Sequence, residues 1–225
     1  MFIDIEEEVG FSQNQIDFNL IPSSPFRKNN FSEEQKIQLI SYHFEKILEI
    51  IGLDLTDDSI CKTPHRFAKM LIQELFKGLD ERNFPTITTQ ENKFNYDQML
   101  FEANISIKSV CEHHFAPILG YCHIAYFPKN KVIGLSKLNR VAQYFASRPQ
   151  VQERMTRQIK EALVQVLETD DIAVVVDAVH LCVRMRGVQD NDALTRTASY
   201  GGKFNESEFR REFLSSIPKL TDVKL

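Results

Sequence analysis

The chain lacks an uninterrupted apolar stretch long enough to span a membrane, and its first residues, MFIDIEEEVG, are acidic rather than basic. A signal peptide needs a basic region followed by an apolar run, so we expect no secretion signal, no membrane partner and a cytoplasmic location. A formal net charge of −4 likewise gives no general electrostatic case for a nucleic-acid partner. An anionic ligand would therefore have to meet a local cluster of basic side chains.

Cysteine is scarce as well, with four residues among 225. In a reducing compartment such cysteines are more often thiols or metal ligands than disulfide partners. Cys61 and Cys122 stand in ordinary settings and are interpreted as structural. Cys111 and Cys182 differ, because each has a histidine two or three residues away, at the spacing of metal ligands, in the segments CEHH and HLC.

The pattern of apolar residues divides the chain into three parts. Residues 1–30 are poorly periodic and predict an extension that is either loose or docked on a neighbour. Residues 31–96 predict a helical arm, with one helix between the N-cap Ser32 and Gly52 and a second from Thr63 to about residue 78. Residues 97–225 carry the strands and the candidate site.

Strand patterns dominate the third part. Apolar and polar residues alternate over residues 99–107, which predicts a strand with one wet face and Cys111 on its buried side. A second strand is expected over residues 120–127. The run IAVVVDAVHLCVRMRG is the strongest strand signal, and a strand there would place His180 and Cys182 on the same face.

Two helices are expected between these strands. Ser136 can cap the first, and Pro149 can open the second, longer one. Strands and helices in this order, preceded by a helical arm, predict the α+β class.

The segments CEHH and HLC offer a metal ion two thiols and an imidazole from distant parts of the chain. The Cys-x-x-His spacing supplies two ligands from one turn, and Cys182 supplies a third. Three protein ligands leave one coordination position for water, whose pKa then falls to about 7. An alternative stays open for each segment alone, namely a core cysteine and a histidine pair on the surface.

The segments VCEHHFAPILG, VIGLSKLNRVAQYFASRPQVQERMTRQI and VDAVHLCVRMRGV, in this order and spacing, resemble GTP cyclohydrolase I. The similarity runs from about Thr63 to Phe204, and its most specific blocks are RPQVQER and CEHH. The resemblance implies zinc-dependent opening of the GTP purine ring at C8 with release of formate. Ribose rearrangement and ring closure would then give 7,8-dihydroneopterin triphosphate, the first step towards tetrahydrofolate and pterins.

The resemblance also implies a role for each residue of the two metal segments. Cys111, His114 and Cys182 would hold Zn2+. His113 would donate a proton to purine N7, and His180 would be a second acid or base near the ribose. Hydrolytic opening of an aromatic ring needs a strong nucleophile and a protonated departing nitrogen, which a metal beside an imidazole can provide.

Substrate contacts follow from the same resemblance. Glu153, with Gln152 beside it, would accept hydrogen bonds from guanine, and the less favoured alternative is that this pair belongs to a solvated first helical turn. Four basic residues would bind the triphosphate and Ser136 would serve the later ribose steps, but each cation alone could be a surface charge. The four are Arg66, Lys137, Arg140 and Arg186.

For the fold, the resemblance implies a two-layer antiparallel sheet backed by helices, of the tunnelling (T-fold) type. Subunits would form a homodecamer of two stacked pentamers, with pockets at subunit boundaries. Two rival functions make different demands on these segments. A reductase or synthase of the same fold, acting on pterins or deazapurines, is disfavoured by the intact CEHH and HLC segments. A silent nucleotide-binding oligomer with structural zinc would be free to lose His113 or His180, yet both are present.

Overall fold

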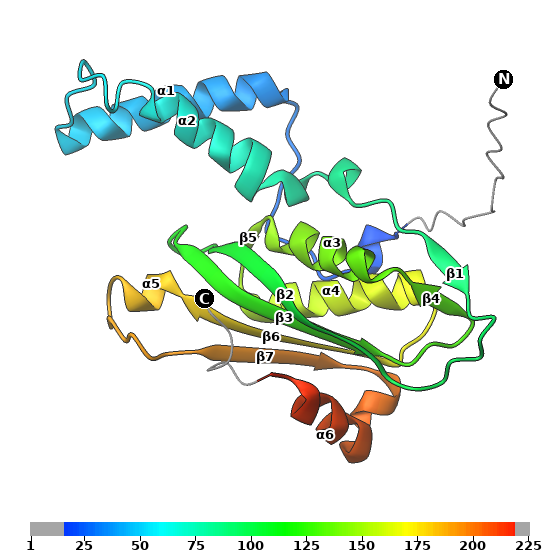
Figure 1. Cartoon of the computed structure of the whole chain (residues 1–225). Coiled ribbons are helices and arrows are strands. Elements are labelled where there is room, and N and C mark those ends of the chain that lie inside the picture. Colours follow the sequence, from blue (N-terminus) through cyan, green and yellow to red (C-terminus); the bar gives the residue numbers. More distant parts are fainter. Residues whose placement is uncertain (1–15, 219–225) are drawn as a thin grey trace, which may run out of the picture.

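The computed structural model describes residues 16–218, whose helices and strands are labelled in Figure 1. The helical elements are η1 (Phe18–Leu20), α1 (Glu33–Ile51), α2 (Thr63–Lys69), the π-helical η2 (Met70–Leu75), η3 (Lys77–Leu79), η4 (Glu81–Asn83), α3 (Leu135–Ala146), α4 (Gln152–Leu167), α5 (Leu181–Arg184), η5 (Gly202–Asn205) and α6 (Ser207–Ser216). The strands are β1 (Thr89–Glu91), β2 (Leu100–Cys111), β3 (Pro117–Tyr126), β4 (Lys131–Ile133), β5 (Pro149–Gln150), β6 (Ile172–His180) and β7 (Thr195–Tyr200). Within residues 16–218 no helix is both long and apolar enough to cross a bilayer.

One five-stranded sheet, in the order β5-β2-β3-β6-β7, forms the centre of the fold. Its pairs are antiparallel except for the short parallel contact between β2 and β5. Helices α3 and α4 lie over one face, α6 lies under the other, and α1 with α2 extends away as an arm (Figure 1). The α+β class and the N-terminal helical arm are confirmed.

Two cores lie on opposite faces of this sheet. The larger one packs Leu138 and Phe145 of α3, and Ile159 of α4, against the sheet, and all three are fully buried. The smaller one packs Phe204 and Phe213 against the other face. Strand β6 contributes to both cores, which explains its nearly continuous apolar sequence.

Strand β2 changes face partway along its length. The pairing with β3 shifts around Asn104, which has a left-handed φ of 58°. Because one extra residue reverses the direction of the following side chains, Phe101 packs on the α6 side and Ile105 under α3 and α4. The unbroken alternation predicted for residues 99–107 is therefore wrong, although Cys111 is buried as predicted.

Helix α1 begins and ends as the sequence predicts. The Ser32 hydroxyl accepts from the Gln35 backbone N–H at 3.2 Å, and the Gln35 side chain accepts from the Ser32 N–H at 2.8 Å. This capping box satisfies two N–H groups that have no partner inside the helix. Gly52 closes the other end with a left-handed φ of 91°.

Helix α2 begins at Thr63 as predicted, but the predicted starts of α3 and α4 are displaced. Gly134, not Ser136, occupies the N-cap of α3, so Ser136 lies within the first turn. Helix α4 begins at Gln152 rather than at Pro149, because residues 149–150 are extended and pair with the end of β2.

Strand β6 is shorter than predicted. It ends at His180, opposite Ile118, and α5 follows at once. Its partner β3 cannot extend the ladder, since Pro117 has no N–H and the preceding residues form a turn. The prediction that His180 and Cys182 share a strand face is wrong, because Cys182 lies in the helical turn.

The described part of the N-terminal extension packs on its own chain. The Gln165 side chain bonds to the backbone N–H and C=O of Asp17, at 2.8 and 3.1 Å, and Gln158 Nε2 donates to the carbonyl of Pro22 at 2.6 Å. The ring centroids of Phe18 and Phe84 are 5.7 Å apart. Residues 1–15 lie outside the described range, so the prediction of a loose or docked extension stays open there.

The close approach of β3 and β6 gives a test of the fold. A Cβ added at Gly120 would lie 2.0 Å from the carbonyl oxygen of Asp177 and 2.5 Å from Cα of Ala178. We expect Gly120→Ala to lower the free energy of unfolding by about 2 kcal/mol, measured by denaturant titration. The exposed control Lys108→Ala, on the neighbouring strand, should change it by less than about 0.5 kcal/mol. Equal midpoints for both variants would contradict this packing.

Candidate metal centre

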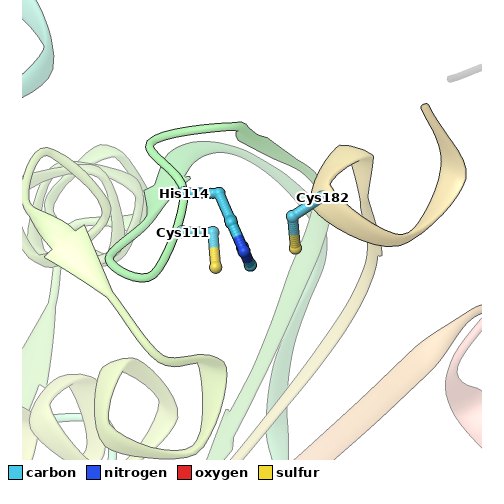
Figure 2. A group of neighbouring side chains, drawn as sticks. All are labelled: Cys111, His114 and Cys182. Carbon is cyan, nitrogen blue, oxygen red and sulfur yellow. The ribbon is translucent and has the colours of Figure 1, made fainter. Parts of the chain in front are cut away.

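Three potential metal ligands from two distant segments meet at one end of the sheet. Cys111 is the last residue of β2, His114 lies in the turn that follows, and Cys182 lies in α5. One ligand atom from each lies within 4.8 Å of the other two. Figure 2 shows the three side chains pointing the same way into the space between the turn and α5.

A tight turn brings His114 back beside Cys111. The Cys111 N–H donates to the carbonyl of Ala116 at 2.8 Å, and the Phe115 N–H donates to the carbonyl of Cys111 at 2.9 Å. Phe115 adopts a left-handed φ of 51°, which reverses the chain. Its ring lies 5.5 Å from that of Phe76, so the end of the helical arm contacts this turn. We call residues 111–116 the CEHH turn.

The donor set suits a divalent metal ion. Two cysteines and one histidine are the ligands that zinc prefers, and bonds of about 2.0–2.3 Å to a common ion need only small side-chain movements from this arrangement. Burial raises the pKa of the Cys182 thiol, and the adjacent Cys111 thiol adds to the shift. A cation between the two thiols would relieve this penalty by stabilising both thiolates. The group can therefore hold a metal ion.

His113 lies at the edge of this group. Its Nδ1 is 3.7 Å from Cys111 Sγ, and its ring centroid is 6.5 Å from that of His114, with the planes at 73°. The side chain is exposed. An exposed imidazole beside the candidate metal ligands can exchange a proton with a molecule bound there.

His180 is held in one tautomer by Gln152. The Gln152 side-chain amide donates to the carbonyls of Val176 and Thr195, at 2.9 and 3.0 Å, so its oxygen must face His180 Nε2 at 2.8 Å. The proton therefore lies on Nε2 and the lone pair on Nδ1. Burial lowers the pKa of His180, and the Glu153 carboxylate opposes this shift. The imidazole is consequently neutral near pH 7.

Two more of the predicted site residues lie at the same end of the sheet. Glu153 is exposed in the first turn of α4, close enough to act on the pKa of His180. Arg186 follows α5, and its Nη1 lies 3.0 Å from His114 Nε2. Gln152, in contrast, is only 1% exposed, with its amide fully engaged inside the protein.

The remaining predicted residues do not join this group within one chain. Ser136, Lys137 and Arg140 lie at the start of α3, where Asn139 Nδ2 donates to Glu102 Oε1 near the beginning of β2, at 3.4 Å. The path along β2 from Glu102 to Cys111 is nine residue steps, which is about 30 Å in a strand.

The basic residues outside the CEHH end therefore have other surroundings in this chain. Lys137 Nζ donates to the carbonyl of Thr86 at 2.9 Å. Arg66 is exposed on α2, in the helical arm. The predicted site is thus divided between two ends of the sheet and the arm.

Glu112 belongs to the CEHH turn, and Gln150 and Arg154 lie against it, although no role is predicted above for any of the three. The Glu112 carboxylate is paired with the Arg154 guanidinium, and the Glu112 N–H donates to the carbonyl of Gln150 at 3.0 Å. Sequence signals could not reveal this arrangement, because it depends on the parallel pairing of β2 with β5.

Comparisons with known proteins agree with these motifs. A family model described as GTP cyclohydrolase I matches residues 40–218. A protein of Flavobacterium johnsoniae named GTP cyclohydrolase 1 is 46% identical over 216 residues, which is 95% of each chain. Proteins of the same name from Vibrio campbellii and Aeromonas salmonicida are 50% and 49% identical over 195 residues, 86% of this chain and 90% and 89% of theirs.

The group of Cys111, His114 and Cys182 predicts that binding of a divalent ion depends on both thiols. We expect the purified chain to bind about one divalent ion, and Cys111→Ser or Cys182→Ser to weaken that binding by at least about 100-fold, since each removes one of three ligands. Elemental analysis and titration with a chelator measure both effects. Cys61→Ser, which changes an exposed thiol, is the control and should bind the ion normally. Full metal content in both ligand variants would refute the assignment.

Proposed function

The chain belongs to the GTP cyclohydrolase I family, and we propose that it opens the purine ring of GTP at C8 with zinc, releases formate and forms 7,8-dihydroneopterin triphosphate. The observation that carries the proposal is the convergence of Cys111, His114 and Cys182 within 4.8 Å, with His113 beside Cys111 and His180 two residues before Cys182. The relatives' names support GTP as the substrate. The first step of pterin and tetrahydrofolate synthesis would then be the role of the reaction.

Zinc is the proposed metal, held by Cys111, His114 and Cys182. When bound there, the ion would supply Lewis acidity that makes water a strong nucleophile near neutral pH. The chain's own contribution is to keep both cysteines and one imidazole at a single point at the end of the sheet. The two thiols must stay reduced for this purpose, which is consistent with the proposed cytoplasmic location.

His113 and His180 are the proposed acid and base. Release of C8 as formate takes two hydrolytic C–N cleavages, and each departing nitrogen gains a proton. His113 is exposed beside Cys111, and we propose that it protonates N7. His180 has its proton on Nε2, directed at Gln152, so its Nδ1 lone pair can accept a proton during the later ribose steps.

Glu153 is the proposed acceptor for the N–H groups of guanine. It is exposed, it lies near His180, and a carboxylate is the strongest acceptor for two adjacent donors. Gln152 is proposed to lie beside the same edge of the base, where its engaged amide keeps His180 oriented. Arg186, near His114, is proposed to bind phosphate.

We further propose that the pocket is completed by another copy of the chain. Ser136, Lys137 and Arg140 lie about 30 Å along the sheet from Cys111, too far for one GTP to contact both sets in one subunit. Both edges of the sheet offer open strands: β5 covers only the last two residues of β2, and β7 is paired on one side only among the described residues.

Two different open edges allow head-to-tail pairing, which can close into a ring. A decamer of two stacked pentamers is the proposed form. In it, the second subunit would supply Ser136, Lys137 and Arg140 for the ribose and triphosphate, and Arg66 would approach from an arm.

The decisive assay is incubation with GTP, with formate and a pterin that fluoresces after oxidation as the products measured. For His113→Ala we expect turnover to fall by about 10²- to 10⁴-fold, as for loss of a general acid, with the metal retained. His43→Ala, which changes an exposed histidine of α1, is the matched control and should keep normal turnover. Formate release by His113→Ala at the normal rate would refute the proposed role.

A shared pocket predicts complementation between two inactive variants. Cys182→Ser removes a metal ligand at one end of the sheet and Arg140→Ala removes a cation at the other. When equal amounts are dissociated and reassembled together, about one quarter of the pockets should receive both intact halves. Each variant reassembled with itself is the control. Turnover that stays at the level of these controls would refute a pocket composed from two subunits.

A further inference from the structure

A chain of side chains connects the CEHH turn to helix α4. Its first contact is the pair between the Glu112 carboxylate and the Arg154 guanidinium. The two side chains are only 20% and 16% exposed. Glu112 lies between the proposed ligand Cys111 and the proposed acid His113, so a contact that fixes its side chain also restrains the turn.

Arg154 is itself fixed by the residues of β5. Its Nε donates to Gln150 Oε1 at 3.2 Å, and its Nη2 lies 3.4 Å from the carbonyl of Pro149. The Gln150 carbonyl accepts from the Glu112 N–H at 3.0 Å. The turn is therefore attached twice, once through its backbone and once through its carboxylate.

Further buried amides extend the chain away from the metal group. Gln150 Nε2 donates to the carbonyl of Phe145 at 2.8 Å and to Gln158 Oε1 at 2.7 Å, and both glutamines are 0% exposed. Gln158 Nε2 in turn donates to the carbonyl of Pro22 at 2.6 Å. Each member has its partners, so the network holds one arrangement rather than several.

We infer that Glu112 and Arg154 are positioning residues for the metal centre. Their pair holds the CEHH turn so that Cys111 and His114 face Cys182 before any ion binds. A turn without this attachment would have to be ordered by the ion itself, and the lost conformational freedom would weaken binding. For catalysis the inference rests on the proposed function, but for metal binding it does not.

Several contacts favour positioning over a direct role for Glu112. Its carboxylate is occupied by Arg154, and it is not a member of the metal group. A largely buried carboxylate and guanidinium are stable only as a pair with additional hydrogen bonds. Arg154 donates such bonds to Gln150 and to the carbonyl of Pro149.

The test uses the full-length protein and measures affinity for Zn2+ by competition with a chromophoric chelator. Glu112→Gln and Arg154→Gln should each weaken binding by about 10- to 100-fold, the loss typical when partners behind metal ligands are removed. The double variant should be no more than about twofold weaker than the poorer single variant, because both changes break one interaction. Arg154→Lys keeps the charge and should retain more affinity than Arg154→Gln.

Two controls separate positioning from general effects. Arg157→Gln removes an exposed guanidinium from the same helix and should leave affinity unchanged. Arg196→Gln breaks another carboxylate pair, in which Arg196 Nε lies 2.6 Å from the buried Asp177, and should lower the melting temperature without weakening Zn2+ binding. The visible absorption of bound Co2+ should change in Glu112→Gln and stay as in the unchanged protein for both controls.

The inference is overturned if Glu112→Gln binds Zn2+ within about twofold of the unchanged protein, or if Arg196→Gln loses as much affinity as Glu112→Gln. Glu112→Gln is nearly isosteric and decides the matter if Arg154→Gln fails to fold. The failure of the proposed function is distinguishable: an unchanged protein that releases no formate would refute the function, while the Zn2+ measurements would still judge the positioning pair.

Discussion

Strand β3 pairs with β2 on one side and with β6 on the other, and the candidate metal centre depends on this pairing. Val110 lies opposite Pro117, and His180 lies opposite Ile118, so a single strand separates the ends of β2 and β6. Two strand spacings amount to about 10 Å, a gap that the CEHH turn and the helical turn α5 can close from either side. Without the common partner, the two cysteines would belong to unrelated parts of the surface.

The local features of this protein are readable from its sequence, because short-range interactions determine them. The capping box at Ser32 follows from the spacing of Ser32 and Gln35, and the buried position of Cys111 follows from the alternation of the strand leading to it. The meeting of CEHH with HLC is predicted from their ligand chemistry and from the family resemblance, not from local interactions. Non-local pairing is not readable in this way. The face change at Asn104 arises from the ladder with β3, and the extended conformation of Pro149 arises from its contact with β2.

The same limit applies to the site. Sequence spacing groups residues by chemistry but gives no distances between them, and in a single chain the residues predicted for the site lie at opposite ends of the sheet and on the helical arm. The ends of that sheet differ in character: one gathers thiols and imidazoles, and the other gathers Lys137 and Arg140. A weakly acidic chain can therefore offer concentrated positive charge to a triphosphate, provided that the two ends come from different copies. The proposed assembly and the proposed activity would then depend on the same interface.

Beyond the register shift at Asn104, the number of residues in β2 determines which face of the sheet Cys111 lies on. From Ile105 to Cys111 the number of steps is even, so the thiol emerges on the same side as the residue that anchors the strand under its helices. The side on which the thiol lies therefore depends on whether the number of residues in this stretch is even or odd, not on its length. Insertion or deletion of two residues between Ile105 and Cys111 would lengthen or shorten the strand and keep the sulfur inward. Insertion or deletion of one residue would turn the sulfur outward.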